Sequence, residues 1–422
     1  MLSNKHEHGQ ALVIIVFALV GLLAFTALTV DGGMVFSDRR NAQNAADTAA
    51  FAGALASTRN QNITNAVLNR AASNNYNNDH TSNYVTDTIN TPLANGICPA
   101  TSVGTEITVQ ITSHVPTHFA QIIGIPQVTN RVFATSRACG IYVAPIFGGN
   151  ALVALGKSGI DFNATGNPDW TITGSGIFSN SSSCDSVTAG GAATVTAPSI
   201  TTVATSCGVD GITGIPVTAN ATPYDWSAYK TTLPPTPNCT GTPTHSGNNW
   251  YPQAGTQGTN IGTNVEFVGD MHFAPGLYCI TNSPGSFNGL ITGNSVTFYS
   301  NVPGFHMKYA GNGAGLTATA PTDPNNSYKN VLMFIEPEVS GSTLLNTQAI
   351  DLRGNGNNDI TGSIIAPSAQ LTLFGNSTGS GIYQTQLIGY QIDTGGGANI
   401  NINYDSTLNY HSPQPAQIQL LK

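Results

Sequence analysis

Six cysteines are the residues of this chain with the clearest chemistry: Cys98, Cys139, Cys184, Cys207, Cys239 and Cys279. None lies within four residues of another, which excludes the closely paired cysteines that hold zinc or exchange disulfides. An even number downstream of an apolar segment predicts up to three disulfides formed in an oxidising compartment. We expect sequence neighbours to pair, Cys98 with Cys139, Cys184 with Cys207 and Cys239 with Cys279. Other connectivities and six free buried thiols are the alternatives.

One acidic stretch, DLRGNGNND, offers oxygen ligands of the kind that calcium prefers. They come from Asp351, Asn355, Asn357 and Asp359, with Arg353 among them. The stretch lacks the ligand spacing and the closing glutamate of a calcium-binding loop. A turn with a paired arginine is therefore the preferred interpretation, and we predict no metal and no cofactor.

Two close pairs of ionisable residues are also weak candidates. Glu336 and Glu338 flank a proline and are interpreted as exposed loop residues rather than a general acid–base pair. His114 and His118 are four residues apart, but Pro116 between them disfavours a shared helical face. The sequence contains neither a P-loop nor an H-E-x-x-H motif. We therefore predict a protein that is not an enzyme.

The composition favours a neutral, turn-rich β protein outside the cytosol. The 13 Lys and Arg against 21 Asp and Glu leave a net charge of −8, which disfavours nucleic-acid binding because that function needs clustered cations. Only 8% of the residues are charged, yet 40% are hydrophobic, so disorder driven by charge is also disfavoured. The 46 Gly and 23 Pro indicate many turns.

The N-terminal segment contains an uncharged run, ALVIIVFALVGLLAFTALTV, from Ala11 to Val30. A helix of this length just crosses a hydrocarbon core of about 30 Å. The run is longer than the core of a typical signal peptide, and no A-x-A site closes it. We predict a short tail and a retained single-pass anchor over residues 1–33. Flanking charges leave the orientation open, but the cysteines favour an extracytoplasmic bulk. A secreted adhesin that loses its N-terminus is an alternative.

Residues 34–73 are expected to form an Ala-rich helical stem, with Asp31-Gly32-Gly33 loosening one turn before it. The stretch from Gly9 to Ala56 closely resembles the N-terminal domain of TadE/TadG-like proteins, which belong to the Tad (Flp-type) pilus-assembly systems. The matching residues are Gly9, Gln10, Asp31, Gly32, Arg39, Arg40, Gln43, Asn44, Ala45, Ala46 and Asp47. The resemblance implies a pilus-assembly protein whose partners are other Tad/Flp membrane proteins.

One position departs from the pilin-like branch of that family. Pilin-like TadE sequences resemble GQALVE, whereas here Ile14 replaces the glutamate. The resemblance therefore implies a TadG-like, membrane-anchored accessory protein, and it leaves processing after Gly9 open.

Residues 74–140 are expected to form a small α/β module that also resembles TadE/TadG-like proteins. A helix is predicted over Ile63–Ala72 just before it. Alternating apolar residues predict strands over Thr105–Ser113 and Val128–Ser136, with a helical turn over Phe119–Gly124 between them.

Residues 141–422 carry short β-prone runs, none longer than eight residues, between Gly- and Asn-rich turns. The segments Ile364–Ala366 and Leu387–Gly389 are 23 positions apart (387 − 364), which fits one turn of a parallel β-helix. We predict a mainly β protein whose large domain is a right-handed parallel β-helix-like solenoid. A Pro-rich segment, 213–250, is interpreted as an irregular excursion from it.

The main hypothesis is a membrane-anchored structural or adhesion protein of a Tad-like pilus apparatus, with a surface glycan as one candidate ligand. The alternative is a surface-tethered β-helix polysaccharide lyase or hydrolase. A groove lined by several of five carboxylates would favour that enzyme: Glu336, Glu338, Asp351, Asp359 and Asp393.

Overall fold

The computed structural model describes residues 8–99, 102–205, 207–261, 269–282, 285–287, 289–309, 314–354, 359–375, 381–396 and 399–421. The chain divides into two compact units. The helix–sheet unit comprises residues 1–143 and 413–422, and the β unit comprises residues 144–412. The β unit is thus inserted in the sequence of the helix–sheet unit. The tail over residues 1–7 lies outside the described residues.

A single helix, α1 (His8–Thr58), includes both the apolar run and most of the Ala-rich stem. It continues without a break through Gly32 and Gly33, where the sequence predicts a loosened turn. The cost of two glycines is about 1 kcal/mol each, which the long helical segments on either side offset. A second helix, α2 (Ile63–Ala72), is capped by the Asn62 side chain and confirms the predicted helix.

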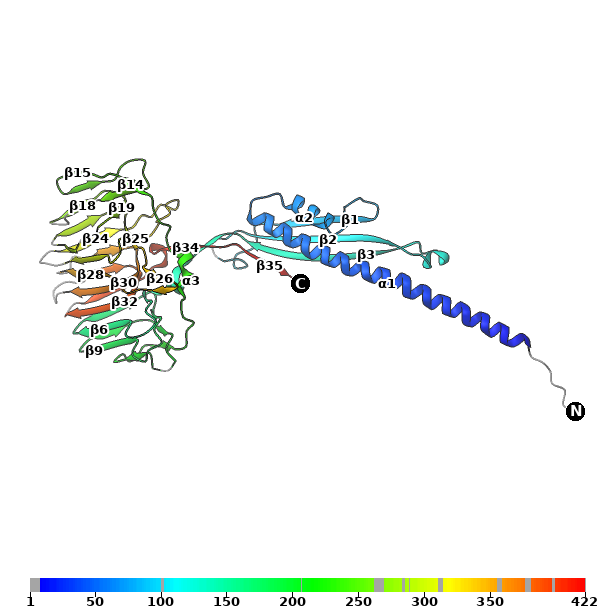
Figure 1. Ribbon diagram of the computed structural model, residues 1–422, viewed down its shortest axis with the longest axis horizontal. Helices are drawn as coiled ribbons and strands as arrows, with labels where there is room; N and C mark the ends of the chain where they lie inside the picture. Colours follow the sequence, from blue (N-terminus) through cyan, green and yellow to red (C-terminus); the bar gives the residue numbers. More distant parts are fainter. Residues whose placement is uncertain are drawn as a thin grey trace. The chain divides into compact units, whose positions relative to one another are not determined.

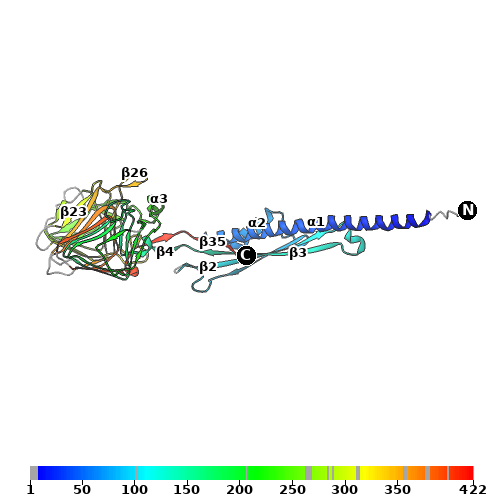
Figure 2. The same ribbon diagram turned by 90° about the horizontal axis from the view of Figure 1, so that it is seen from below.

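The helices of this unit pack on an antiparallel sheet (Figures 1 and 2). Its order is β1 (Asn83–Asn90), β2 (Gly104–Pro116), β3 (Gln127–Cys139) and β35 (Gln417–Leu421). The predicted strands are confirmed as β2 and β3, and the turn between them contains the short helix η1 (Ala120–Ile123). Strands β1 and β35 were not predicted from the sequence.

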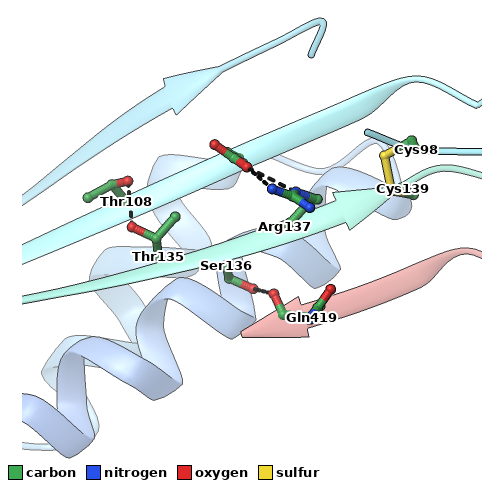
Figure 3. A network of polar contacts seen from close by, with 8 residues as sticks. Cys98, Thr108, Thr135, Ser136, Arg137, Cys139 and Gln419 are labelled. Carbon is green, nitrogen blue, oxygen red and sulfur yellow. Dashed lines mark hydrogen bonds and ion pairs between the residues drawn. A yellow bond between two sulfur atoms is a disulfide. The ribbon is translucent and has the colours of Figure 1, made fainter. Parts of the chain in front are cut away.

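The last strand of the chain completes this sheet (Figure 3). Ser136 of β3 donates a hydrogen bond to the Gln419 carbonyl at 3.2 Å, and Arg137 forms a 2.7 Å ion pair with Glu106 of β2. At the end of β3, Cys139 is bonded to Cys98 in the β1–β2 connection. The sheet therefore joins segments that are nearly 300 residues apart, as the separation of 283 between Ser136 and Gln419 shows.

The β unit is built mainly from parallel strands in two large sheets, with 17 and ten strands among the described residues. The larger sheet contains β5 (Leu152–Ala154), β6 (Phe162–Gly166), β8 (Ile177–Ser179), β9 (Val187–Gly191), β11 (Ile200–Thr202), β12 (Val209–Asp210), β13 (Val217–Thr218), β14 (Cys239–Gly241), β17 (Gly258–Ile261), β19 (Gly276–Ile280), β20 (Gly285–Phe287), β22 (Val296–Ser300), β23 (His306–Tyr309), β25 (Val331–Ile335), β28 (Gln348–Gly354), β30 (Ser363–Gly375) and β32 (Leu387–Gly396). The smaller contains β7 (Asp169–Thr173), β10 (Thr194–Thr196), β15 (Thr244–Ser246), β16 (Asn249–Tyr251), β18 (Met271–Phe273), β21 (Leu290–Gly293), β24 (Gly315–Thr319), β29 (Asp359–Thr361), β31 (Gly381–Gln384) and β33 (Ile400–Asn403).

Minor elements complete the fold. They are β4 (Tyr142–Pro145) paired with β34 (His411–Gln414), β26 (Val339–Ser340) paired with β27 (Thr343–Leu344), α3 (Trp226–Tyr229), η2 (Ile146–Gly149), η3 (Lys230–Thr232) and η4 (Ser406–Leu408).

The two large sheets share one apolar core. Phe162 of the larger sheet and Trp170 of the smaller are both buried, with ring centroids 5.3 Å apart. The predicted 23-residue pairing is confirmed, because Ile364 pairs with Leu387 in parallel register. The prediction that no strand of this region exceeds eight residues is wrong for β30 and β32, which are 13 and ten residues long. In β30, two short apolar runs are joined into one continuous strand across Pro367.

The strands do not stack in sequence order. The smaller sheet runs β10-β7-β33-β31-β29-β24-β21-β18-β16-β15, so its first strand in the sequence, β7, lies beside its last, β33. The larger sheet agrees, because Leu152 of β5 pairs with both Leu387 of β32 and Ile177 of β8. Figure 1 shows β32 next to β6, with β9 towards one end and β14 and β15 at the other. The chain therefore enters this unit inside its sheets and not at an end of either.

The Pro-rich segment 213–250 carries the chain from one end of the sheets to the other. It passes successive strand connections, with the Asn220 amide bonded to the Ala204 carbonyl and the Tyr224 amide to the Asn180 side chain. Farther along, Tyr328 donates a 2.7 Å hydrogen bond to the Pro235 carbonyl. The segment also contains short elements, from β13 to β16, so its irregular character is only partial.

Candidate functional site

Helix α1 changes environment along its length. The large apolar side chains that are described over residues 12–30 are exposed, with Phe17 72% and Phe25 74% exposed. Among the described residues this helix is long and apolar enough to cross a membrane, although the structure contains no membrane. From Ala42 onward one face of the same helix is buried against the sheet. The residues at the boundary between the exposed half and the buried half are therefore the candidate site.

Asp31 lies at that boundary, directly after the apolar run, and is buried. Its carboxylate accepts hydrogen bonds from three consecutive backbone N–H groups, those of His118 at 2.9 Å, Phe119 at 3.0 Å and Ala120 at 2.7 Å. Burial alone would raise the pKa of Asp31, but these amides outweigh it and lower the pKa. The carboxylate therefore stays ionised and fixes the β2–β3 turn to the helix.

A second carboxylate, Asp38, lies two helical turns farther along and therefore on the same face. It accepts hydrogen bonds from Tyr76 at 3.1 Å, from Asn130 at 2.7 Å and from the Ser113 hydroxyl. Burial, followed by the charge of Asp38 and its hydrogen bond, raises the pKa of Tyr76. This group joins α1 to β2, β3 and the segment that follows α2.

Beyond these carboxylates, alanines form the contact face of α1. Ala45, Ala46 and Ala49 are fully buried against the sheet. Gln43 donates to the Asp47 carboxylate at 2.8 Å and to the Phe133 carbonyl at 3.0 Å. Small side chains are required at this contact because they let the helix backbone approach the sheet closely.

The opposite face of the same segment is polar and exposed. It carries Arg39, Arg40 and Asn44, and no ion pair involves either arginine among the described residues. The residues that carry the sequence resemblance therefore divide into an inward set that holds the sheet and an outward set in contact with solvent.

The cysteines pair as sequence neighbours: Cys98–Cys139, Cys184–Cys207 and Cys239–Cys279. These are the pairs expected from the sequence. The third joins Cys239 of β14, within the Pro-rich segment, to Cys279 of β19 in the larger sheet.

The five carboxylates considered for an enzyme come from different parts of the β unit. Asp351 and Asp393 lie on one ladder of the larger sheet, separated by Thr372, whereas Asp359 belongs to the smaller sheet. Glu338 accepts hydrogen bonds from the Gly304 amide and from Gln348. Glu336 accepts one from Thr236.

The structure offers no support for the two candidate metal sites, the calcium stretch and the histidine pair, among the residues it describes. No group of three or more His, Cys, Asp or Glu residues that could hold a metal occurs among the described residues. Asn355 and Asn357 of the calcium candidate lie outside those residues. His114 contacts the Thr129 hydroxyl at 3.0 Å, and the His118 amide is bonded to Asp31.

Comparison with known families addresses the helical segment. Residues 9–56 match the family model described as putative Flp pilus-assembly TadE/G-like. This segment is a Tad domain. We call residues 9–56 the Tad segment; it ends two residues before the end of α1, so it includes both the exposed apolar half and the buried alanine face.

Two other comparisons add little. Competence-associated pilin ComZ from Thermus thermophilus is structurally similar at a TM-score of 0.16 and 9% identity, over 79% of this chain and 88% of that chain. A score of this size supports no conclusion about the fold. No curated protein matches the chain.

The Tad segment contains two residues whose role sequence reasoning missed. Asp31 was noted only as part of the motif, and Asp38 was not singled out. Their spacing of seven residues, followed by Ala42, Ala45 and Ala49, places all five on one helical face. That pattern is the signal that could have identified two carboxylates on the side of the helix that faces the sheet.

Proposed function

We propose that this protein is a membrane-anchored, non-enzymatic component of a Tad/Flp-type pilus-assembly apparatus. The supporting observation is that α1 is one continuous helix with two environments, exposed and apolar over residues 12–30 and buried over its alanine face. An exposed apolar surface of that size needs a nonpolar surrounding. The Tad segment suggests that the partners are other Tad/Flp membrane proteins.

We further propose that the bulk of the protein is extracytoplasmic. In this assignment residues 1–33 are the tail and anchor, 34–73 the stem, 74–140 the α/β module and 141–422 a parallel β-solenoid. Three disulfides support an oxidising location. The parallel register between strands about 23 residues apart, such as Ile364 with Leu387, supports the solenoid.

The solenoid would act as a spacer or as an adhesive surface. The smaller sheet supports the second role with a ladder of paired residues that are polar on every strand except β31, where Ile382 takes the position. Most of the polar ones are exposed: Asn249, His272, Thr292, Thr317, Asp359, Asn401, Thr171 and Thr196. Hydroxyl and amide groups in such a row suit a neutral glycan. Binding of the full chain to immobilised polysaccharides tests this, with Thr292→Lys and Thr317→Lys on the ladder and Thr188→Lys on the larger sheet as control.

Membrane fractionation of cells that produce the full chain tests the anchor. Wild-type protein should remain in the membrane after alkaline carbonate and be released by detergent. The double variant Leu19→Arg, Leu22→Arg should lose membrane association, because each arginine at the bilayer centre costs about 3 kcal/mol or more. Phe51→Arg on the same helix is the matched control.

Location and partners need separate readouts. In intact cells without an outer barrier, added protease should digest the β unit, and non-reducing peptide analysis should recover all three disulfides. Cross-linking should join the chain to pilus-assembly membrane proteins. A soluble cytosolic product with reduced thiols would contradict the proposal.

A further inference from the structure

The turn between β2 and β3 is apolar and unusually exposed. Ile122 and Ile123 are 81% and 78% exposed, more than any large apolar side chain that the structure describes in the transmembrane candidate. Ile125 and Phe119 are also exposed. The turn, THFAQIIGIP over residues 117–126, carries no lysine, arginine or carboxylate. We call residues 119–125 the apolar tip.

The structure places this tip at one defined height on α1. The three amides bonded to Asp31 are those of His118, Phe119 and Ala120, at the base of the tip. Asp31 follows Val30, the last residue of the apolar run. The tip therefore lies beside the level at which the exposed apolar half of the helix ends.

The tip has a fixed conformation. Residues 120–123 form η1, and Gly124 ends it with a positive φ of 88°. The Ile125 amide bonds to the Ala120 carbonyl at 3.0 Å, and Thr117 donates to the Ile125 carbonyl. The isoleucine side chains are thus presented to the outside by a hydrogen-bonded turn.

We propose that the apolar tip is a second membrane contact, in which Ile122 and Ile123 insert into the interfacial layer of the bilayer. This inference rests on the proposed membrane anchoring of α1. It gives the helix–sheet unit two attachments to one lipid surface, so the sheet cannot rotate freely about the helix axis. Uncharged apolar side chains at the boundary of a transmembrane helix partition favourably into that layer.

Lipid fits the tip better than a protein partner. A stable protein interface buries roughly 800 Å² on each partner, whereas the tip is one short convex turn with four exposed apolar side chains. Its base is also bonded to Asp31, the residue that directly follows the apolar run of the helix. A bilayer surface can receive such a narrow projection without a complementary pocket.

Tryptophan quenching by brominated lipids tests the inference on the full chain in phosphatidylcholine and phosphatidylglycerol vesicles. The test variant is Ile123→Trp. Ile97→Trp is the matched control, because Ile97 is 40% exposed beside Cys98, which is bonded to the opposite end of β3. Leu19→Trp reports the anchor. The native Trp170, Trp226 and Trp250 all lie in the β unit and give the background signal, which the wild-type chain measures.

We expect bromine near the headgroups to quench Ile123→Trp at least about twofold more than Ile97→Trp, and bromine deep in the acyl chains to quench Leu19→Trp most. Quenching at Leu19→Trp without an excess at Ile123→Trp would overturn the tip contact and leave the anchor in place. A tip tryptophan that is shielded from water yet not quenched by lipid would indicate a protein partner and also overturn it. Loss of quenching at Leu19→Trp would overturn the anchoring itself.

Correct folding is checked by recovery of the Cys98–Cys139 disulfide. Ile122→Trp is a second tip variant for the case in which Ile123→Trp fails this check. The same excess over Ile97→Trp is expected from it, and its absence would reject the proposal.

Discussion

The carboxylate of Asp31 lies 2.7 Å from the backbone nitrogen of Ala120, although the two residues are 89 positions apart. A charge at the end of an apolar helical run thus determines where a β turn is held. Hydrogen bonds from three amides to a carboxylate are stronger than bonds between neutral groups. The position of the β2–β3 turn is therefore linked to the residue that directly follows the apolar run.

Removing this carboxylate should release the turn. In Asp31→Ala the amides of residues 118–120 lose their acceptor. Hydrogen–deuterium exchange in the peptide covering 117–126 should therefore accelerate by about tenfold or more, because hydrogen bonds to a charged group are stronger than those between neutral groups. Asp31→Asn keeps one acceptor oxygen and should give an intermediate rate. Equal exchange in all three proteins would show that the bonds do not hold the turn.

Because the pKa of Asp31 is lowered in the folded protein, the stability of the helix–sheet unit should decrease at acidic pH. The unfolded carboxyl titrates near 3.9, so its stabilising contribution is complete above that pH and is lost as the pH falls below it.

The alanine face of α1 should tolerate no larger side chain. Ala49→Leu inserts three carbon atoms at a fully buried position and should lower the free energy of unfolding of the helix–sheet unit by about 1–3 kcal/mol. Asn44→Leu, on the exposed face of the same helix, is the control. The difference can be measured as protease resistance of the full chain in detergent. Equal resistance would mean that the face is loosely packed.

A buried carboxyl in the β unit predicts a pH effect of opposite sign to that of Asp31. Burial raises the pKa of Asp161 to about 8, even though Ser179 and the Ser181 amide each donate a hydrogen bond to it at 2.9 Å. Between about pH 4 and 8 the folded chain keeps a proton that the unfolded chain has lost. Stability should therefore fall as pH rises through this window, by about 1.4 kcal/mol per pH unit at most.

Thermal melting measured by tryptophan fluorescence can test this, because all three tryptophans lie in the β unit. The melting temperature of the wild type should fall from pH 5 to pH 8. Asp161→Asn, which resembles the neutral acid, should reduce that slope. An unchanged slope in the variant would assign the pH dependence to another group.

The disulfide between Cys98 and Cys139 should contribute strongly to the helix–sheet unit. It closes a loop of 41 positions, for which chain entropy predicts about 4 kcal/mol. The double variant Cys98→Ser, Cys139→Ser should therefore lose protease resistance in residues 83–139. The β unit, with its own two disulfides, should keep its melting temperature, and a parallel loss there would contradict independent stabilisation.

Local patterns predicted much of this fold. The apolar run, the helix over Ile63–Ala72 and the alternation in β2 and β3 are each set by residues close in sequence, and all appear where expected. The spacing between Ile364 and Leu387 also gave the correct strand partner. These features depend on local periodicity, which a single sequence displays directly.

The remaining features depend on contacts that periodicity does not specify. A repeat length gives the number of residues between two paired strands, but it does not say where in the sheet the first strand lies. The pairing of Leu152 with Leu387 could therefore not be predicted from the repeat length. Strand β35 was missed because five residues near the end of a chain carry little pattern. The buried partners of Asp38 come from three separate segments.

The insertion of the β unit has a consequence for biosynthesis. Strand β3 has β2 on one side as soon as it is made, but its other neighbour, β35, is the last strand of the chain. During synthesis and export β3 therefore presents an open edge until some 280 further residues have emerged, as the separation of 283 between Ser136 and Gln419 indicates. Open strand edges attract other chains. A chaperone or a neighbouring subunit that covers this edge would have access to it only before the C-terminus arrives.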